Sequence, residues 1–312
     1  MRDSHNRPIE YLRLSLTQRC NFSCGYCGGK ASLGEKDELT PREIQLLLEA
    51  FATCGISRLR LTGGEPLLRG DLAEIVRLAA AVPEFNDISL TTNGALLSVP
   101  LAKQLKAAGL RRVNISIDSL KPERFKKITG GGRLADVLGG IDAALSSSLT
   151  PLHLNVVLTR GVNDDEADDF LSFAKNNPVT VRFIELMPFG GAGEGIVPNG
   201  EILARHPELL PVRKEFSGQP SCNFTAPGWK GAAGFISPVT EKFCGVCNRV
   251  RVLADGSLKP CLGSGETTAL KPLLWDRDKL IETIRNAVQN KASGHHFERG
   301  CSAGCTLQQI GG

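Results

Sequence analysis

Short apolar runs alternate with amphipathic segments along residues 1–188, and this alternation predicts the fold. Helix-like segments separate the apolar runs, and the first of them begins at Pro41 with Thr40 as its N-cap. The expected strands are Leu12–Thr17, Arg58–Thr62, Ile88–Thr92, Val113–Ile117, Leu152–Leu158 and Val179–Glu185. The other expected helices lie near Asp71–Ala81, Pro100–Ala108, Arg133–Ser147 and Asp165–Asn176. Consecutive strand–helix units predict an α/β fold with a parallel sheet and right-handed crossovers.

About six such units, closed or nearly closed, would form a partial TIM-type barrel. The alternation stops near Pro188, and the rest of the chain is rich in Pro and Gly. Only two further helices are expected there, near Gly200–Arg205 and Asp276–Asn290, and the tail from Gly294 looks unstructured in isolation. We therefore expect two regions, a partial barrel in residues 1–188 and a smaller irregular region in residues 189–312.

Composition narrows the class of protein. The formal charge of +4 suits an anionic small molecule. Without a dense Lys/Arg stripe, and with 5% aromatic residues, the sequence lacks a nucleic-acid-binding signature. No apolar run is long enough to span a membrane, and the N-terminus is polar without a signal core, so we expect a cytoplasmic protein. Ten cysteines in that compartment point to metal or catalytic chemistry rather than disulfides.

The first cysteine group follows the first expected strand. Cys20, Cys24 and Cys27 have the spacing C-x3-C-x2-C, and their soft thiolates favour zinc, copper(I) or an iron–sulfur cluster. Three cysteines leave one iron of a cubane open to another ligand. A structural zinc loop with a distant fourth ligand is the alternative. Placement at the carboxyl end of a barrel strand favours an active site.

The second cysteine group lies in the irregular region. Cys244, Cys247 and Cys261 have the spacing C-x2-C-x13-C, again with three ligands. The alternative is a zinc knuckle whose fourth ligand is one of Cys222, His295, His296, Cys301 or Cys305. Spacing alone leaves both interpretations open.

The first trio and the turn Thr62-Gly63-Gly64-Glu65-Pro66 resemble the signature of the radical S-adenosylmethionine (SAM) superfamily. Similar matches follow on later strand ends, at residues 91–94, 114–118 and 182–188. The resemblance implies that the first trio holds a 4Fe–4S cluster whose open iron chelates SAM, with Glu65 adding negative charge near that cationic ligand. The SAM-binding residues that it implies are Tyr26, Gly64, Glu65, Asn93, Ser116 and Met187.

The surroundings of the second trio resemble the GTP 3′,8-cyclase family of molybdenum cofactor biosynthesis. The matching motifs are residues 227–231, 235–238, 247–251 and the terminal Ile310-Gly311-Gly312. The resemblance implies a second 4Fe–4S cluster that binds the guanine of GTP. It also implies hydrogen abstraction from ribose C3′ and attack on purine C8, and a Gly311-Gly312 tail that enters the active site. The GTP-binding residues that it implies are Arg13, Arg60, Thr91, His153, Arg249 and Arg251.

The sequence departs from the family pattern at His153, where the family has Lys. Because His is mostly neutral at pH 7, this position lacks the positive charge of Lys, which should weaken the affinity for an anionic substrate. The resemblance further implies a flavodoxin- or ferredoxin-like reductant and a downstream cyclic pyranopterin monophosphate synthase, and it leaves a homodimer open. Two other functions remain as alternatives. One is a radical SAM enzyme that modifies a peptide or other small molecule, with the second cluster as an electron relay, and the other is a zinc-stapled binding protein.

Overall fold

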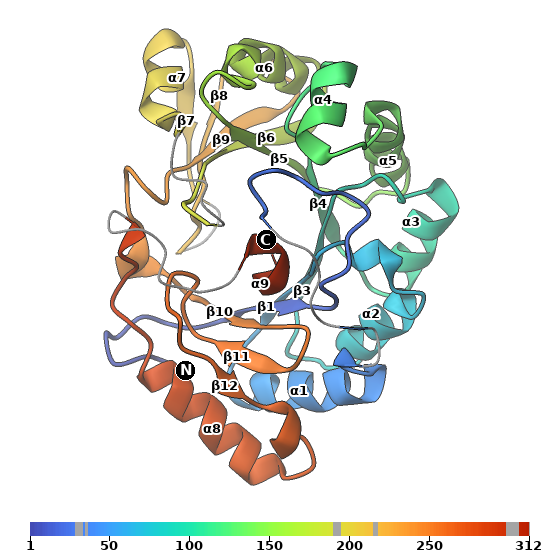
Figure 1. Ribbon diagram of the computed structural model, residues 1–312, viewed down its shortest axis with the longest axis vertical. Helices are drawn as coiled ribbons and strands as arrows, with labels where there is room; N and C mark the ends of the chain where they lie inside the picture. Colours follow the sequence, from blue (N-terminus) through green and yellow to red (C-terminus); the bar gives the residue numbers. More distant parts are fainter. Residues whose placement is uncertain (29–33, 35–36, 190–194, 215–217, 298–305, 312) are drawn as a thin grey trace.

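The computed structural model describes residues 1–28, 34, 37–189, 195–214, 218–297 and 306–311. A parallel-rich sheet with helices on its outer side dominates the fold (Figure 1), which confirms the α/β class. Six parallel strands stand side by side in chain order. They are β1 (Tyr11–Ser15), β2 (Arg58–Thr62), β3 (Asp87–Thr92), β4 (Arg112–Ser116), β5 (Leu152–Leu158) and β6 (Val179–Glu185). All six were expected, with boundaries that differ by no more than two residues.

The helices between these strands bury their apolar stripes against the sheet. They are α1 (Pro41–Thr53), α2 (Leu72–Ala80), α3 (Val99–Ala107), α4 (Pro122–Thr129), α5 (Leu134–Ser146) and α6 (Ala167–Asn176). Thr40 caps α1 as expected, and Glu43 completes a capping box. The sequence analysis missed α4, although Pro122 at its start and Gly130 at its end, with φ 68°, are ordinary boundary signals.

The C-terminal region is more regular than expected, because its strands extend both ends of the same sheet. The strand β9 (Ala232–Ile236) pairs parallel with β6, and β8 (Cys222–Thr225) and β7 (Leu210–Val212) continue that end. At the other end β10 (Arg249–Val252) pairs parallel with β1, followed by β11 (Ser257–Lys259) and β12 (Thr268–Ala269). The prediction of an irregular region was therefore wrong for these strands, which are short and become stable only on an existing sheet edge.

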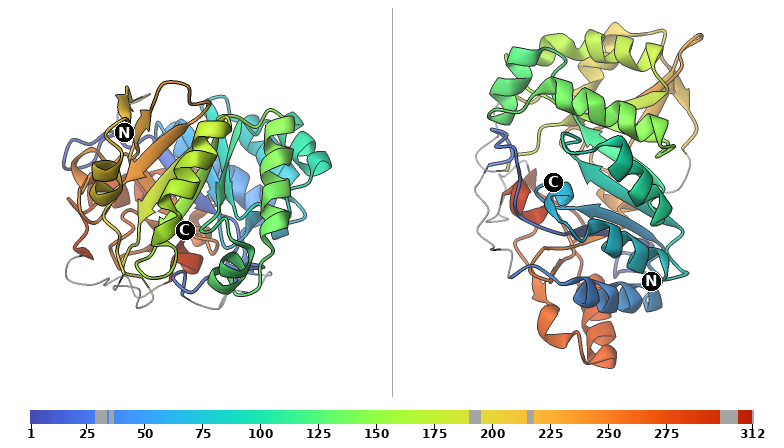
Figure 2. Two further views of the ribbon diagram at one scale, coloured as in Figure 1. Left: turned by 90° about the horizontal axis from the view of Figure 1, so that it is seen from above. Right: turned by 90° about the vertical axis from the view of Figure 1, so that its right-hand side faces the viewer.

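Three helices complete the C-terminal region. The expected helices are present as α7 (Asn199–Arg205) and α8 (Arg277–Gln289). A third, α9 (Leu307–Ile310), is a single turn, and a capping box between Thr306 and Gln309 closes it. It lies on the inner side of the curved sheet, near β1 and β10 (Figures 1 and 2). Among the described residues, no helix combines the length and apolarity that a membrane crossing requires.

The apolar core is divided into two parts. The larger part fills the space between the sheet and its outer helices. The smaller part consists of Phe189, Phe297, Leu307 and Ile310, with Tyr26, Cys27, Met187, Leu253 and Leu262 packed against it. This small cluster joins the chain near the first cysteine trio to α9 and to the chain after Cys261.

Candidate active site

A cavity of about 350 Å³ on the inner side of the sheet brings the two cysteine trios together. Its wall includes all six cysteines of the trios. The other predicted site residues in its wall are Tyr26, Gly64, Asn93, Ser116, Met187, Arg13, Arg60, Thr91, His153, Arg249 and Arg251. Glu65 and Gly311 are not part of the wall, and Gly312 lies outside the described residues.

The loop of the first trio rests on the end of α4. The amide of Ser23 donates to the Thr129 carbonyl at 2.9 Å, and Phe22 packs edge-on against Phe125. A side chain at Gly132 would lie 2.7 Å from the Phe22 ring, so the turn after α4 has to be small there. The helix missed by the sequence analysis therefore supports the loop that carries Cys20, Cys24 and Cys27.

The Gly-Gly turn after β2 is held by backbone contacts to the chain that follows β1. The amide of Gly64 donates to the Thr17 carbonyl at 2.7 Å, and the Glu65 amide donates to the Arg19 carbonyl at the same distance. A Cβ atom at Gly64 would lie 2.3 Å from that Arg19 oxygen. Glycine is thus required for the close approach of the two strand ends, in addition to any role beside a ligand.

Glu65 is fully buried and does not line the cavity. Its carboxylate accepts hydrogen bonds from the Thr92 hydroxyl at 2.6 Å and from the amides of Asn93 at 2.7 Å and Leu67 at 2.9 Å. Burial raises its pKa to about 7, and these hydrogen bonds partly oppose the rise. The observed contacts tie the β2 turn to the β3 turn.

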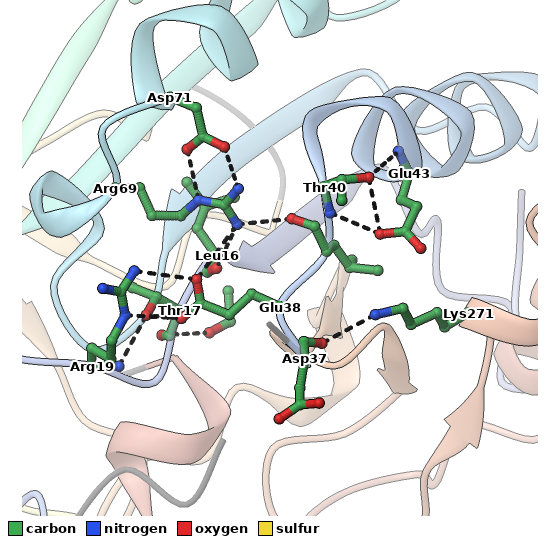
Figure 3. Close-up of polar contacts among 12 residues, drawn as sticks. Leu16, Thr17, Arg19, Asp37, Glu38, Thr40, Glu43, Arg69, Asp71 and Lys271 are labelled. Atoms are coloured by element: carbon green, nitrogen blue, oxygen red, sulfur yellow. Dashed lines mark hydrogen bonds and ion pairs between the residues drawn. The ribbon is translucent and has the colours of Figure 1, made fainter. Parts of the chain in front are cut away.

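Figure 3 shows a polar network that fixes both ends of the first cysteine loop. Glu38, after the loop, accepts from the Thr17 hydroxyl and from Arg19 Nε at 3.3 Å, immediately before Cys20. Arg69 donates to the Leu16 carbonyl at 3.0 Å and the Leu39 carbonyl at 2.8 Å, and pairs with Asp71 at 2.5 Å. The network spans β1, α1 and the β2 turn, so it makes the loop ends part of the rigid sheet.

The first trio consists of thiols that are hard to ionise without a nearby cation. Burial raises the pKa of Cys27 to about 12, and repulsion from Cys20 and Asp118 adds to the shift. Burial, Asp118 and Cys27 likewise raise the pKa of Cys24. Asp118 also accepts the Tyr26 hydroxyl at 2.7 Å. Because metal ligation requires thiolates, a cationic group bound here would be stabilised by all three thiols at once.

The second trio has the opposite electrostatic setting. Cys244 begins a short 3-10 turn (Cys244–Val246), and Cys247 precedes β10. Burial alone would raise the pKa of Cys247, but the charges of Arg249 and Lys291 outweigh it and lower the pKa. A thiolate is therefore favoured at this position.

Arginines occupy one register row across neighbouring strands. Arg251, Arg13 and Arg60 are Cα partners on β10, β1 and β2. Burial, and then the neighbouring Arg249, lower the pKa of Arg251 to about 10. Within the described residues, Nε and Nη2 of Arg249 and Nη1 of Arg251 are buried without a hydrogen-bond acceptor. A phosphate bound here would accept hydrogen bonds from these closely spaced guanidinium groups and would be stabilised by their charge.

His153 lies on β5 and is 4% exposed. Burial lowers its pKa well below the usual value, and Arg182, Arg112 and Arg60 lower it further. The ring is therefore neutral at pH 7 and adds no charge to the site.

The tail reaches the cavity through specific contacts. The Leu307 amide donates to the Cys27 carbonyl at 3.1 Å, and Gln308 Nε2 donates to the Gln18 carbonyl at 2.8 Å. The carbonyl of Gly311 accepts from Arg13 at 3.2 Å and from the Thr62 hydroxyl at 3.1 Å. Leu307 and Gln308 line the cavity and Gly311 contacts Arg13 of its wall, while the entry of the Gly-Gly tail into the active site stays a prediction.

Sequence reasoning missed several residues of the cavity wall. They include Tyr11, Arg58, Arg112 and Lys291, while Asp118 and Arg182 lie in the matching motifs but were given no role. Strand alternation could have found Arg58, because it stands two residues before Arg60 and shares its face. No sequence signal marks Lys291, which follows α8.

Two family models match the chain: "Radical SAM superfamily" over residues 14–174 and "Molybdenum Cofactor Synthesis C" over residues 179–297. The GTP 3′,8-cyclase of Moorella thermoacetica is 45% identical, and the match covers 100% of both chains. That of Clostridium acetobutylicum is 40% identical, also over 100% of both chains. The chain belongs to the GTP 3′,8-cyclase family of radical SAM proteins.

This family membership favours the cyclase over the peptide-modifying enzyme and the zinc-stapled protein. Among solved structures, SuiB of Streptococcus suis bound to S-adenosylmethionine has a TM-score of 0.60 and 11% sequence identity, covering 94% of this chain and 72% of that chain. At that identity the likeness shows the fold alone. The donor sets fit the two 4Fe–4S clusters of the family, because each trio offers three free thiols at one shared cavity.

Proposed function

We propose that this protein cyclises GTP to (8S)-3′,8-cyclo-7,8-dihydroguanosine 5′-triphosphate, the first step of molybdenum cofactor biosynthesis. The observation that carries the proposal is one cavity lined by two three-cysteine sets and by seven arginines. This combination matches a reaction that needs a radical source, a second metal site and a polyanionic substrate. Relatives named for this activity match along the full chain.

In this proposal Cys20, Cys24 and Cys27 hold the first 4Fe–4S cluster, and Cys244, Cys247 and Cys261 hold the second. When bound, the clusters and SAM supply the radical chemistry at the ribose and purine of GTP. The residues assigned to SAM are Tyr26, Gly64, Asn93, Ser116 and Met187, with Glu65 supporting the turn. This last assignment follows from the hydrogen bonds of Glu65 to Leu67, Thr92 and Asn93.

The arginine row, together with Arg249, orients the triphosphate. Arg13, Arg60, Arg249 and Arg251 offer planar forks that match phosphate oxygens, and Thr91 adds a hydroxyl. Binding of an anion offsets the repulsion among these cations. Two backbone-contacting residues of the tail, Leu307 and Gln308, help to keep water from the space between the trios, together with the small apolar cluster.

We also propose that the inner six strands act as a partial barrel, with residues 1–188 and 189–312 as its two functional regions. The sheet is continuous between them through β6–β9 and β1–β10. The proposed electron donor is a flavodoxin- or ferredoxin-like protein, because SAM cleavage needs one electron at a time. The proposed location of the protein is the cytoplasm. The proposed consumer of its product is a cyclic pyranopterin monophosphate synthase. A homodimer is compatible with these proposals.

Anaerobic incubation with SAM, a strong reductant and GTP tests the function. We expect 5′-deoxyadenosine and the cyclised triphosphate to form in parallel, both measured by mass spectrometry. A matched incubation with ATP in place of GTP is the control for purine recognition. SAM cleavage that never yields a cyclised nucleotide would reject GTP as the substrate.

Substitution Arg251→Ala should weaken GTP binding about 10- to 100-fold, because a charge-assisted hydrogen bond is worth roughly 1.5–3 kcal/mol. SAM affinity should stay near the wild-type value. His153→Lys should tighten GTP, since it adds a charge where the neutral ring supplies none. Equilibrium binding under anaerobic conditions measures both affinities. Arg42→Ala, on the exposed face of α1, is the control. Unchanged GTP affinity in Arg251→Ala and His153→Lys would exclude the arginine row as the phosphate site.

A further inference from the structure

The N-terminal arm, residues 1–10, contains a buried ion pair, although chain ends are usually exposed to solvent. Arg7 is 4% and Asp3 5% exposed, and Arg7 Nε donates to Asp3 Oδ2 at 2.6 Å. The Asp3 carboxylate also accepts the Arg7 amide at 2.9 Å. The carboxylate thus fixes the orientation of the guanidinium, whose two remaining nitrogens face other parts of the chain.

Those two nitrogens donate to four carbonyls of the C-terminal region, including that of Lys291 at 3.5 Å from Nη2. Arg7 Nη1 donates to the Cys244 carbonyl at 2.9 Å and to the Ser293 carbonyl at 2.8 Å. Arg7 Nη2 donates to the Ala292 carbonyl at 2.7 Å. A guanidinium is the one side chain that can hold a carboxylate and several carbonyls in a single plane. Arg7 therefore clamps the first cysteine of the second trio to the segment that follows α8.

The clamped segment, residues 291–294, forms the back of the second trio. A Cβ atom at Gly294 would lie 3.3 Å from the Cys244 sulfur, so this backbone passes directly against that cysteine. Lys291 is 2% exposed and lines the cavity, and its ammonium donates to the carbonyl of Pro260, the residue before Cys261. Among the described carboxylates, none is ion-paired with Lys291.

We propose that Arg7 is a positioning residue of the second-trio site and that it holds Lys291 in place as the buried counter-charge of that trio. The inference rests on the proposed function only in assigning a 4Fe–4S cluster to Cys244, Cys247 and Cys261. A buried cation without a carboxylate is costly unless an anion lies nearby. Three thiolates on a cluster supply that negative charge, and Lys291 lines the same cavity with its ammonium on the carbonyl of Pro260, the residue before Cys261.

Arg7→Ala tests the clamp. The variant should retain about four irons instead of about eight after reconstitution, by the cubane stoichiometry. It should still cleave SAM without GTP, because the first trio and its network do not involve Arg7. In the metal-free protein, alkylation mapped by mass spectrometry should be faster at Cys244 than in the wild type. Arg2→Ala is the matched control, since the guanidinium of this exposed arginine of the same arm donates to the nearby Asn6. Full iron content with wild-type Cys244 alkylation would overturn the role of Arg7.

Lys291→Met tests the counter-charge and does not depend on the Arg7 variant. In a background with Cys20, Cys24 and Cys27 replaced by Ala, only the second cluster contributes to the electron paramagnetic resonance signal. A nearby cation favours the reduced, more negative cluster, so Lys291→Met should lower its midpoint potential. Lys279→Met, at an exposed position of α8, should leave the potential unchanged. Equal potentials in the Lys291→Met and parent proteins would refute the counter-charge.

These readouts separate the inference from the proposed function. Iron content, thiol alkylation and midpoint potential are measured without GTP. A protein that fails to cyclise GTP but loses the second cluster in Arg7→Ala would keep the inference and reject the substrate. A protein that cyclises GTP but has an unaltered second cluster in both Arg7→Ala and Lys291→Met would keep the proposed function and reject the inference.

Discussion

Joint replacement of Cys20, Cys24 and Cys27 by Ala is expected to halve the iron content and abolish SAM cleavage. Joint replacement of Cys244, Cys247 and Cys261 should also halve the iron, from about eight to about four per chain by the cubane stoichiometry, but leave some SAM cleavage uncoupled from product. SAM cleavage differs between the two variants because only the first trio is assigned to the SAM-binding cluster. Each variant should keep its remaining cluster because different parts of the fold hold the two trios. The first rests on α4 and the Glu38–Arg69 network, and the second on β10 and the Arg7 clamp.

Iron and sulfide analysis, together with 5′-deoxyadenosine formation, measures this outcome. Cys222→Ala and Cys54→Ala are the controls, because these cysteines lie on β8 and at the end of α1 and neither lines the cavity. Both controls should hold about eight irons. Retention of all iron in either triple variant would mean that the ligands have been misassigned.

Truncation after Ile310 is expected to abolish the cyclised product while both clusters, SAM binding and GTP binding survive. The anchors of α9 remain in the truncated chain, since Leu307 and Gln308 bind the carbonyls of Cys27 and Gln18. What is lost is the Gly311 carbonyl, which accepts from Arg13 and Thr62, two residues of the cavity wall. Ordering a tail residue costs roughly 1–2 kcal/mol, so contacts of this kind are needed to keep it in place.

Gly311→Ala provides a milder version of the same test. The φ of Gly311 is 76°, and a Cβ atom there would lie 3.0 Å from Thr62 and 3.1 Å from Ser15. The added methyl group should therefore displace the tail and lower product formation without loss of iron. Product analysis by mass spectrometry decides both variants, with Gln309→Ala as a comparison on the outer capping box. A truncated chain that forms product at the full-length rate would show that the tail is dispensable.

Much of the fold could be predicted from local sequence. The strands β2, β5 and β6 agree with the expected ranges, because their apolar residues recur at alternate positions and are buried, while polar residues between them line the cavity. The helix α4 was missed, since its eight residues carry few apolar positions beside Phe125. The strands β7–β12 were missed for a different reason. Each is short, and the edges offered by β6 and β1 stabilise them.

Local patterns along the chain were enough to predict the importance of the two cysteine spacings, of the Gly-Gly turn after β2 and of the arginines on strand positions, because each pattern has a chemical meaning of its own. Which of these residues come together depends on the folded chain. Pairing of β10 with β1 brings Arg251 beside Arg13, although they are far apart in sequence, and turns two separate motifs into one cationic wall. The same folding directs Glu65 into the protein rather than the cavity. It also places Arg7 behind Cys244 and Lys291 beside Cys261. Such long-range contacts depend on which strands pair at the sheet edges and which side chains are buried together, and both involve segments that are distant in sequence. No local pattern encodes them.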